Sequence, residues 1–227
     1  MRNLVTVART AVVAGLIGAT AVGLAGSAAA ADSGALYGDP AGAAQYWAQQ
    51  TEGDCVLMAV ADVVGQVTGD MPTEAEIIAT AASTPSESHP GMIYTPDDSG
   101  DPNAGAGTNG GDVPALLRVY GIDSDYTDAD RGGKNGNIDS GLDALQDYLG
   151  QGRKVIAIVD AWTIWGEQDQ SDGSNHGLVV TGVDTGSGIV HLNDSGVENG
   201  ADEQVSIDTF VKAWQSAADE TMIVTRA

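Results

Sequence analysis

The pattern of apolar and polar residues divides the chain into a helical part followed by a part rich in strands. Cys55 to Val67 is apolar on nearly every face, which predicts a central helix that is covered on most sides. Thr73, followed three residues later by Glu76, has the form of a capping box and predicts the start of a second helix. Residues 138–149 repeat apolar side chains at helical spacing up to Gly150, and a shorter helix is expected over 116–120.

After residue 150 the apolar period changes to that of strands. Apolar runs predict strands over 155–159, 178–183, 188–192 and 222–224. The short turn 184–187 joins the second strand to the third and predicts a hairpin, and Ser206 is expected to begin a helix over 206–216. Because helices come first and antiparallel strands second, we expect an α+β fold with N-terminal helices packed on a C-terminal antiparallel sheet.

The N-terminal residues predict export, and the rest of the chain is expected to form one folded domain. Arg2 and Arg9 precede an apolar stretch of small residues, and Ala28-Ala29-Ala30 offers a cleavage point. We therefore expect a signal peptide over 1–31, secretion to the exterior or the cell envelope, and no membrane attachment after its removal. The Gly/Ala-rich residues 32–45 are expected to form a flexible arm, followed by the domain over 46–227. The Pro/Gly-rich residues 83–110 predict a long loop.

The charge balance narrows the range of partners. The chain has 32 acidic and 9 basic residues, a formal net charge of −23. Such a surface repels nucleic acid and anionic lipid, so we expect neither as a partner, and we expect a soluble monomer. Residues 128–139 have acids at positions 1, 3 and 12 of a calcium-loop pattern, but Gly132, Asn135 and Asp139 depart from it. We therefore expect a solvated acidic loop, with no metal and no cofactor.

The single cysteine is the main candidate for chemistry. Cys55 has no disulfide partner within the chain, and it stands where the first central helix begins. A helix N-terminus and a nearby imidazolium both favour a thiolate. The predicted hairpin brings His176, at the start of one strand, close to Asn193 and Asp194, at the end of the other. Either of these two side chains is able to hold the imidazole in one tautomer.

Four segments resemble the bacteriocin-processing (double-glycine leader) peptidases, and especially their stand-alone secreted relatives. The segments are Gln49-x5-Cys55, Asn175-His176-Gly177 with 178–184, Val190-His191-Leu192-Asn193-Asp194, and 206–214 with Phe210 and Trp214. The resemblance covers about residues 45–224 and implies a papain-like fold and hydrolysis of peptide bonds in a peptide or protein substrate. It implies Cys55 as nucleophile, His176 as general base and then acid, and Asp194 as the group that orients His176. Gln49 would line the oxyanion hole, with Gln50 as the alternative.

One departure from this family leaves a second function open. Val56 stands where these peptidases usually have glycine, and its branched side chain is expected to crowd an acyl group on the thiol. The alternative is therefore a catalytically inactive papain-fold protein that serves as an extracellular binding module. A cell-wall amidase on the same fold is a third possibility, although such enzymes usually carry Ser-Gly after the nucleophile. The other histidines, His89 and His191, are expected to be solvated or structural.

Overall fold

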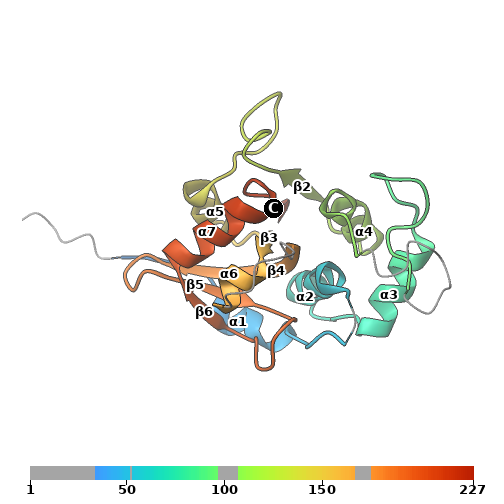
Figure 1. The fold of residues 1–227 in the computed structure, drawn as a ribbon, viewed down its shortest axis with the longest axis horizontal. Coiled ribbons are helices and arrows are strands. Elements are labelled where there is room, and N and C mark those ends of the chain that lie inside the picture. The colour runs from blue at the N-terminus through green and yellow to red at the C-terminus, as the bar shows by residue number, and fades with distance from the viewer. Residues whose placement is uncertain (1–33, 52, 97–106, 167–174) are drawn as a thin grey trace, which may run out of the picture. The chain divides into compact units, whose positions relative to one another are not determined.

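One antiparallel sheet organises the domain in the computed structural model, which describes residues 34–51, 53–96, 107–166 and 175–227 (Figure 1). Within these residues the sheet has seven strands in the order β2-β7-β3-β4-β5-β6, and β1 also pairs with β4. The strands are β1 (Leu36–Gly38), β2 (Ser124–Thr127), β3 (Val155–Asp160), β4 (Asn175–Asp184), β5 (Ile189–Asn193), β6 (Glu203–Ser206) and β7 (Met222–Thr225). The predicted signal peptide, 1–31, lies outside the described residues.

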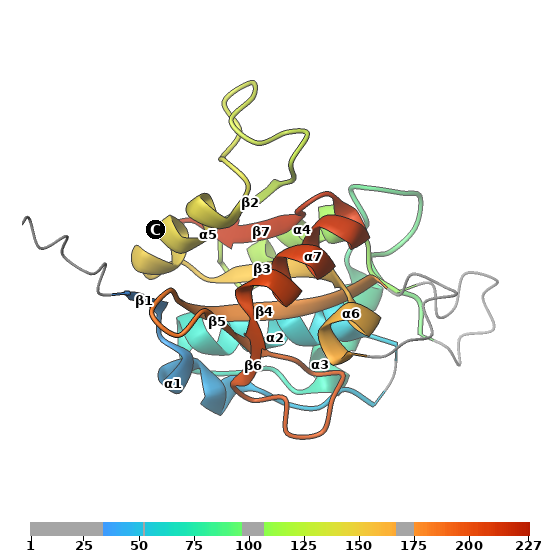
Figure 2. The same ribbon diagram turned by 60° about the vertical axis from the view of Figure 1, so that its left-hand side comes forward.

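Helices cover both faces of this sheet (Figure 2). On one face lie α2 (Cys55–Thr68), α3 (Glu74–Ser83) and α4 (Val113–Val119), and on the other lie α5 (Leu142–Gly150), α6 (Ala161–Trp165) and α7 (Ile207–Ala218). The strands alternate between the two sides: Ile156 and Ile158 join the core under α2, whereas Val155 and Val159 join the core with Phe210 of α7. The predicted α+β fold class is confirmed, with the addition that the sheet is covered on both faces.

The helix that carries Cys55 begins after Asp54 and ends at a glycine. Asp54 occupies the N-cap position, and Gly69 ends the helix in the left-handed conformation at φ 81°. In α3 the predicted capping box is present: the Thr73 hydroxyl accepts from the Glu76 amide, and the Glu76 carboxylate accepts from the Thr73 amide. The predicted cap of α7 is also present, since the Ser206 hydroxyl accepts from the Thr209 amide at 3.0 Å.

The expectation of a flexible arm over 32–45 is wrong for its described part. Residues 36–38 form β1, paired with 182–184 of β4, and Asp39 caps a short helix, α1 (Pro40–Ala43). The small residues here serve close packing: a Cβ on Gly38 would lie 2.3 Å from the Thr181 carbonyl oxygen. The folded domain therefore begins before residue 46.

Four further elements differ from the sequence prediction. The helix expected over 138–149 begins only at Leu142, and the strands β2 and β6 and the helix α6 had no sequence signal of their own. Part of the long loop 83–110 is held by a residue that follows it: the buried Asp112 carboxylate accepts from the Ser86 hydroxyl at 2.7 Å and from the Glu87 amide at 2.8 Å. Among the described residues, none of the helices has the length and apolar character needed to cross a membrane.

Candidate active site

The thiol of Cys55 lies at the N-terminus of α2, beside β4. Cys55 is the first residue of the helix, and its Sγ accepts from the backbone N–H of Gly177 at 3.4 Å. The thiol also forms hydrogen bonds with the side chain of His176 and the backbone amide of Val56. The helix comes from one face of the sheet and the histidine from a strand, so packing between α2 and β4 sets the distance between the two reactive groups.

The surroundings of Cys55 lower the pKa of its thiol. Burial by itself raises this pKa, because it penalises the anion. The hydrogen bond and charge of His176 act in the opposite direction, and so do the amides of Gly177 and Val56. The second group of influences prevails, so the thiol of Cys55 has a lower pKa than an ordinary cysteine.

Asp194 holds the imidazole of His176 from the side away from the thiol. His176 Nε2 lies 2.6 Å from Asp194 Oδ1, and both side chains are buried. Two further donors hold the carboxylate: the Gly196 amide at 2.7 Å on Oδ1 and the Trp165 indole N–H at 2.9 Å on Oδ2. Because Asp194 engages Nε2, Nδ1 is the ring nitrogen available to Cys55.

These contacts shift the pKa values of His176 and Asp194 apart. Burial by itself lowers the pKa of His176, but the hydrogen bonds to Asp194 and Cys55 and their charges outweigh it and raise the pKa. For Asp194, burial raises the pKa, and the hydrogen bonds from His176, Trp165 and Gly196 together with the charge of His176 bring it below its ordinary value. The directions of the three pKa shifts therefore favour a thiolate at Cys55, an imidazolium at His176 and a carboxylate at Asp194.

Asn193, the alternative partner of His176, points elsewhere. Its side-chain amide donates to Asp62 Oδ2 at 2.7 Å and to the Ala43 carbonyl at 3.0 Å. Asp62 lies within α2 and also accepts from Gln66 at 2.6 Å. The structure thus places Asp194 beside His176, whereas Asn193 ties β5 to helix α2.

Of the two glutamines considered for the oxyanion hole, the structure places the alternative, Gln50, at the cavity and leaves Gln49 away from it. Gln49 is exposed and does not line the cavity at Cys55, whereas Gln50 does. Gln50 is held by Ser195: its amide N–H donates to the Ser195 carbonyl at 2.9 Å, and its Oε1 accepts from the Ser195 hydroxyl at 2.8 Å. A loop without periodicity gives the sequence no means to choose between neighbouring glutamines.

Val56 lies at the wall of the site and packs closely against Gly177. A Cβ on Gly177 would come within 2.7 Å of Val56 Cγ2, so glycine at 177 makes room for the valine. Val56 is 7% exposed. The branched side chain that departs from the expected pattern is therefore accommodated by the neighbouring strand.

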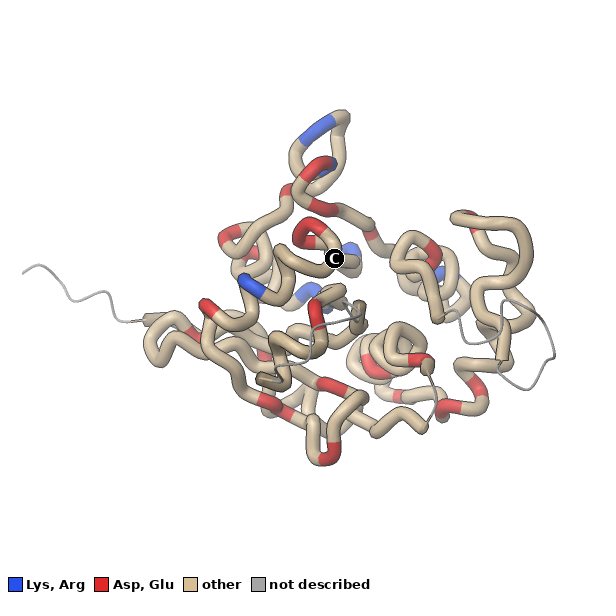
Figure 3. Tube along the Cα trace, in the orientation of Figure 1, with Lys and Arg blue, Asp and Glu red and all other residues tan. Residues whose placement is uncertain are grey.

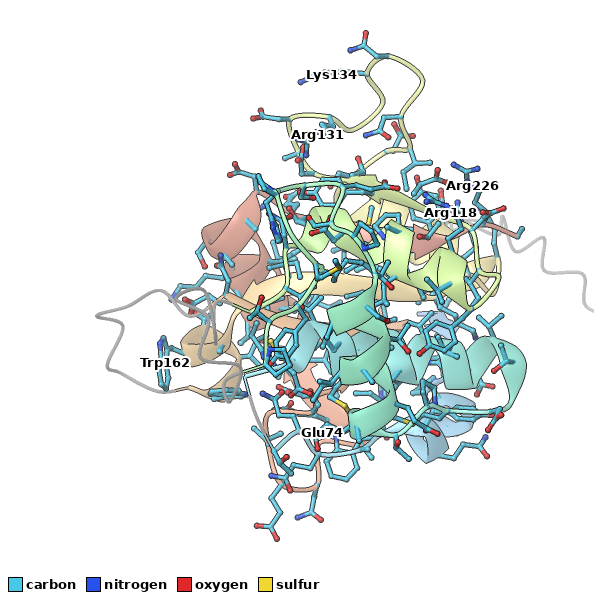
Figure 4. All side chains as sticks on the ribbon, turned by 90° about the vertical axis from the view of Figure 1, so that its right-hand side faces the viewer. Glu74, Arg118, Arg131, Lys134, Trp162 and Arg226 are labelled. Carbon is cyan, nitrogen blue, oxygen red and sulfur yellow. The ribbon has the colours of Figure 1, made fainter. Side chains whose placement is uncertain are left out.

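A cavity of about 610 Å³ lies in front of these groups. It is lined by Gln50, Gly53, Cys55, Val56, 107–110, Tyr126, Ile158, Trp165, 175–177, Gly196, Ala218 and Thr221. Trp165 packs on His176 with ring centroids 5.4 Å apart, and Trp162, labelled in Figure 4, meets Trp165 edge to face at 5.8 Å. The sequence did not indicate that Ser195 holds Gln50, or that Tyr126 and Thr221 line the cavity. These three residues come from segments far from Cys55 in the sequence.

The described lining of this cavity contains no lysine or arginine. Figure 3 shows acidic positions on most elements and few basic ones, in keeping with the sequence. Several of the basic side chains, Arg118, Arg131, Lys134 and Arg226, are labelled in Figure 4 in its upper half, away from Trp162. The positive charge that faces the Cys55 thiol therefore comes from His176 and not from a lysine or arginine of the lining.

The part of the chain that the structure describes contains no cluster of three or more His, Cys, Asp or Glu side chains that could hold a metal ion. In the loop with the calcium-like pattern, the Asp128 carboxylate accepts from the Arg131 amide at 2.8 Å and forms an ion pair with its guanidinium.

Comparison with known proteins identifies the family of this chain. The family model described as the peptidase C39-like family matches residues 44–222. The chain belongs to the peptidase C39-like family. This confirms the family that the segments around Cys55, His176 and Asp194 had suggested.

Two relatives and one solved structure extend this finding. The chain is 51% identical to the uncharacterized proteins Rv1268c of Mycobacterium tuberculosis and Mb1299c of Mycobacterium bovis, over 98% of this chain and 98% of each relative. A putative C39-like peptidase from Bacillus anthracis superposes with a TM-score of 0.53 at 17% identity, covering 80% of this chain and 94% of that one. The likeness of fold and the family together make this chain a cysteine peptidase-like protein with a papain-like fold.

Proposed function

We propose that this protein is a secreted cysteine peptidase that hydrolyses peptide bonds through Cys55, His176 and Asp194. The observation that carries the proposal is the hydrogen-bonded chain from the thiol at a helix N-terminus through the imidazole to a buried carboxylate. The cavity in front of the thiol provides space for a substrate chain. The apolar N-terminal segment with small residues before Asp32 supports secretion.

The acylation step uses each group in turn. The Cys55 thiolate attacks the carbonyl carbon of the peptide bond, and the carbonyl oxygen becomes an oxyanion. The Gln50 side-chain amide and the Cys55 backbone N–H are the donors for that oxyanion. The imidazolium of His176 then gives its proton to the leaving amine, the C–N bond breaks, and a thioester to Cys55 remains.

The second step reverses the roles of the imidazole. The now neutral His176 takes a proton from water, and the resulting hydroxide attacks the thioester carbon. The C–S bond breaks, the peptide acid leaves, and the thiolate and imidazolium are restored. Asp194 keeps the ring in one orientation throughout, because its two oxygens are held by His176, Trp165 and Gly196.

The experiment is hydrolysis of a fluorogenic peptide library by the protein over residues 32–227. We expect turnover by the native chain and none by Cys55→Ala or His176→Ala, whereas His191→Gln, outside the cavity, should keep the native rate. Absence of turnover by the native chain, with Cys55 unreactive towards an epoxide inhibitor in the folded protein, would contradict the proposal.

Val56 favours a second function, that of a binding module without turnover. Its side chain lines the cavity at the position that follows the nucleophile. If it prevents acylation, peptides bind but are not cleaved, binding survives Cys55→Ala, and Val56→Gly brings about turnover. If the native chain cleaves peptides and Val56→Gly adds nothing, the second function is excluded.

A further inference from the structure

A second carboxyl group lies behind the His176–Asp194 pair. Glu203 is the first residue of β6 and pairs with Leu192 of β5, two residues before Asp194. Its carboxyl is within hydrogen-bonding reach of the Asp194 carboxyl. Its Oε2 is buried and has no hydrogen-bond donor among the residues that the structure describes. A carboxyl group that contacts another carboxyl group and has a buried oxygen without a donor needs an explanation.

A shared proton explains this contact. Two ionised carboxylates side by side repel each other, and neither can donate a hydrogen bond to the other. Asp194 already accepts from His176, Trp165 and Gly196, so its ionised form is the favoured one. The proton therefore belongs on Glu203, where it supplies the missing hydrogen bond.

The ionisation of Glu203 agrees with this geometry. Burial, then the charge of Asp194 and the hydrogen bond to it, raise the pKa of Glu203 to about 7, against a smaller opposite effect of His176. The other ionisable groups on the neighbouring strand β5, its following loop and helix α7 are His191, which pairs with Asp202 at 2.6 Å, and Glu198, Asp208 and Lys212.

We propose that Glu203 is a positioning residue that carries a proton in weakly acidic solution, and that its O–H donates to Asp194 and keeps that carboxylate turned towards His176. The hydrogen bond adds a fourth side chain to the line that begins at Cys55. Its purpose in catalysis rests on the proposed function, but the contact itself can be tested without any substrate.

The first experiment follows the His176 ring resonances by NMR as the pH is raised from 5 to 9. We expect a step near pH 7 in the native protein, as Glu203 loses its proton next to the imidazole, and no such step in Glu203→Gln. Asp62→Asn is the matched control, because burial raises the pKa of Asp62 to about 7 as well. The step should persist in that variant. A step that survives Glu203→Gln, or its absence from the native protein, would overturn the proposal.

The second experiment separates positioning from simple packing. At pH 6 we expect Glu203→Gln, whose amide still donates to Asp194, to keep the rate of Cys55 alkylation by iodoacetamide within about twofold of the native rate. Glu203→Ala leaves the carboxylate without this donor and should lower the rate about fivefold or more. Equal rates for all three proteins would refute the positioning role. Because alkylation needs no peptide, a failure here is distinct from a failure to find a peptide substrate.

Discussion

At the scale of single residues, the site is a set of opposed pKa shifts. The same contact between Cys55 and His176 lowers the pKa of the thiol and raises that of the imidazole. Each charged form therefore stabilises the other, which is how a papain-like site holds a thiolate at a pH where a free cysteine is mostly protonated.

The pH dependence of Cys55 follows from these directions. Because the pKa is lowered, the rate of alkylation by iodoacetamide should reach half of its maximum at a pH below the ordinary cysteine value of about 8.5. Hydrolysis should have a second limb, lost as pH rises through the raised pKa of His176, above about 6.5, because the general acid is then missing. His176→Ala should move the alkylation curve to higher pH, and His191→Ala should leave it unchanged. A native curve identical to that of the unfolded chain would contradict the ion pair.

The two neighbouring glutamines give a matched test of the oxyanion hole. Gln50→Ala removes a side-chain amide held in the cavity by Ser195, and we expect kcat to fall about a hundredfold or more. Gln49→Ala changes an exposed side chain and should stay within about twofold of the native rate. The measurement is steady-state hydrolysis of a fluorogenic peptide, with unfolding monitored to verify that both variants fold. Equal losses in the two variants would remove Gln50 from the mechanism.

At the scale of elements, a buried polar bridge between Asp62 and Asn193 joins helix α2 to strand β5, which leads to Asp194. Asp62 of α2 and Asn193 of β5 are both buried, and Asn193 also accepts from the Asp202 amide at 3.2 Å through Oδ1. Burial is the largest influence on Asp62 and raises its pKa to about 7, against the hydrogen bonds from Gln66 and Asn193 and the charge of Lys154. The bridge therefore costs stability once Asp62 is ionised.

The sign of this effect gives a stability prediction. Because the pKa of Asp62 is higher in the folded than in the unfolded chain, protonation favours folding, and its contribution grows as pH falls from 8 towards 5. Native minus Asp62→Asn stability should therefore increase by about 1 kcal/mol for each unit that pH falls below 7. Urea unfolding at pH 5, 6, 7 and 8 measures this difference. A difference that does not vary with pH would show that Asp62 is ionised in the folded protein throughout.

Elements with their own local signal were predictable from the sequence, whereas elements formed by long-range pairing were not. The apolar run after Cys55 and the Thr73–Glu76 capping box depend on nearby residues, and both are present in the structure. β6 has exposed or half-buried residues and acquires its place by pairing with β5. The choice of Gln50 over Gln49 depends on Ser195, which is 145 residues away in sequence from Gln50. Periodicity carries no information about such contacts.

At the scale of the whole molecule, the N-terminal strand completes the sheet around β4. β1 extends the pairing of β4 beyond the region that β3 covers, and the Asp39 amide donates to the Thr181 carbonyl at 3.1 Å. Ala43 of α1 is buried and accepts from Asn193 through its carbonyl. Residues 36–43, which were expected to belong to an arm, therefore support the Asp62–Asn193 bridge to helix α2.

Removal of these residues gives a prediction on stability. A chain that begins at residue 46 loses β1, α1 and one of the two acceptors of the Asn193 amide, and we expect its free energy of unfolding to fall by about 2–4 kcal/mol. A chain that begins at residue 34 is the control and should unfold like the protein over 32–227. Thermal and urea unfolding of the three proteins make the comparison. Equal stability of all three would restore the interpretation of residues 32–45 as an arm.

The isolation of the reactive sulfur in this sequence has a consequence for redox chemistry. Cys55 is the only cysteine in the chain. If it forms a mixed disulfide with a small thiol in an oxidising exterior, no second cysteine of the same molecule can attack and release it. Recovery then depends on a reductant supplied from outside, so the redox state of the surroundings would set the fraction of competent molecules.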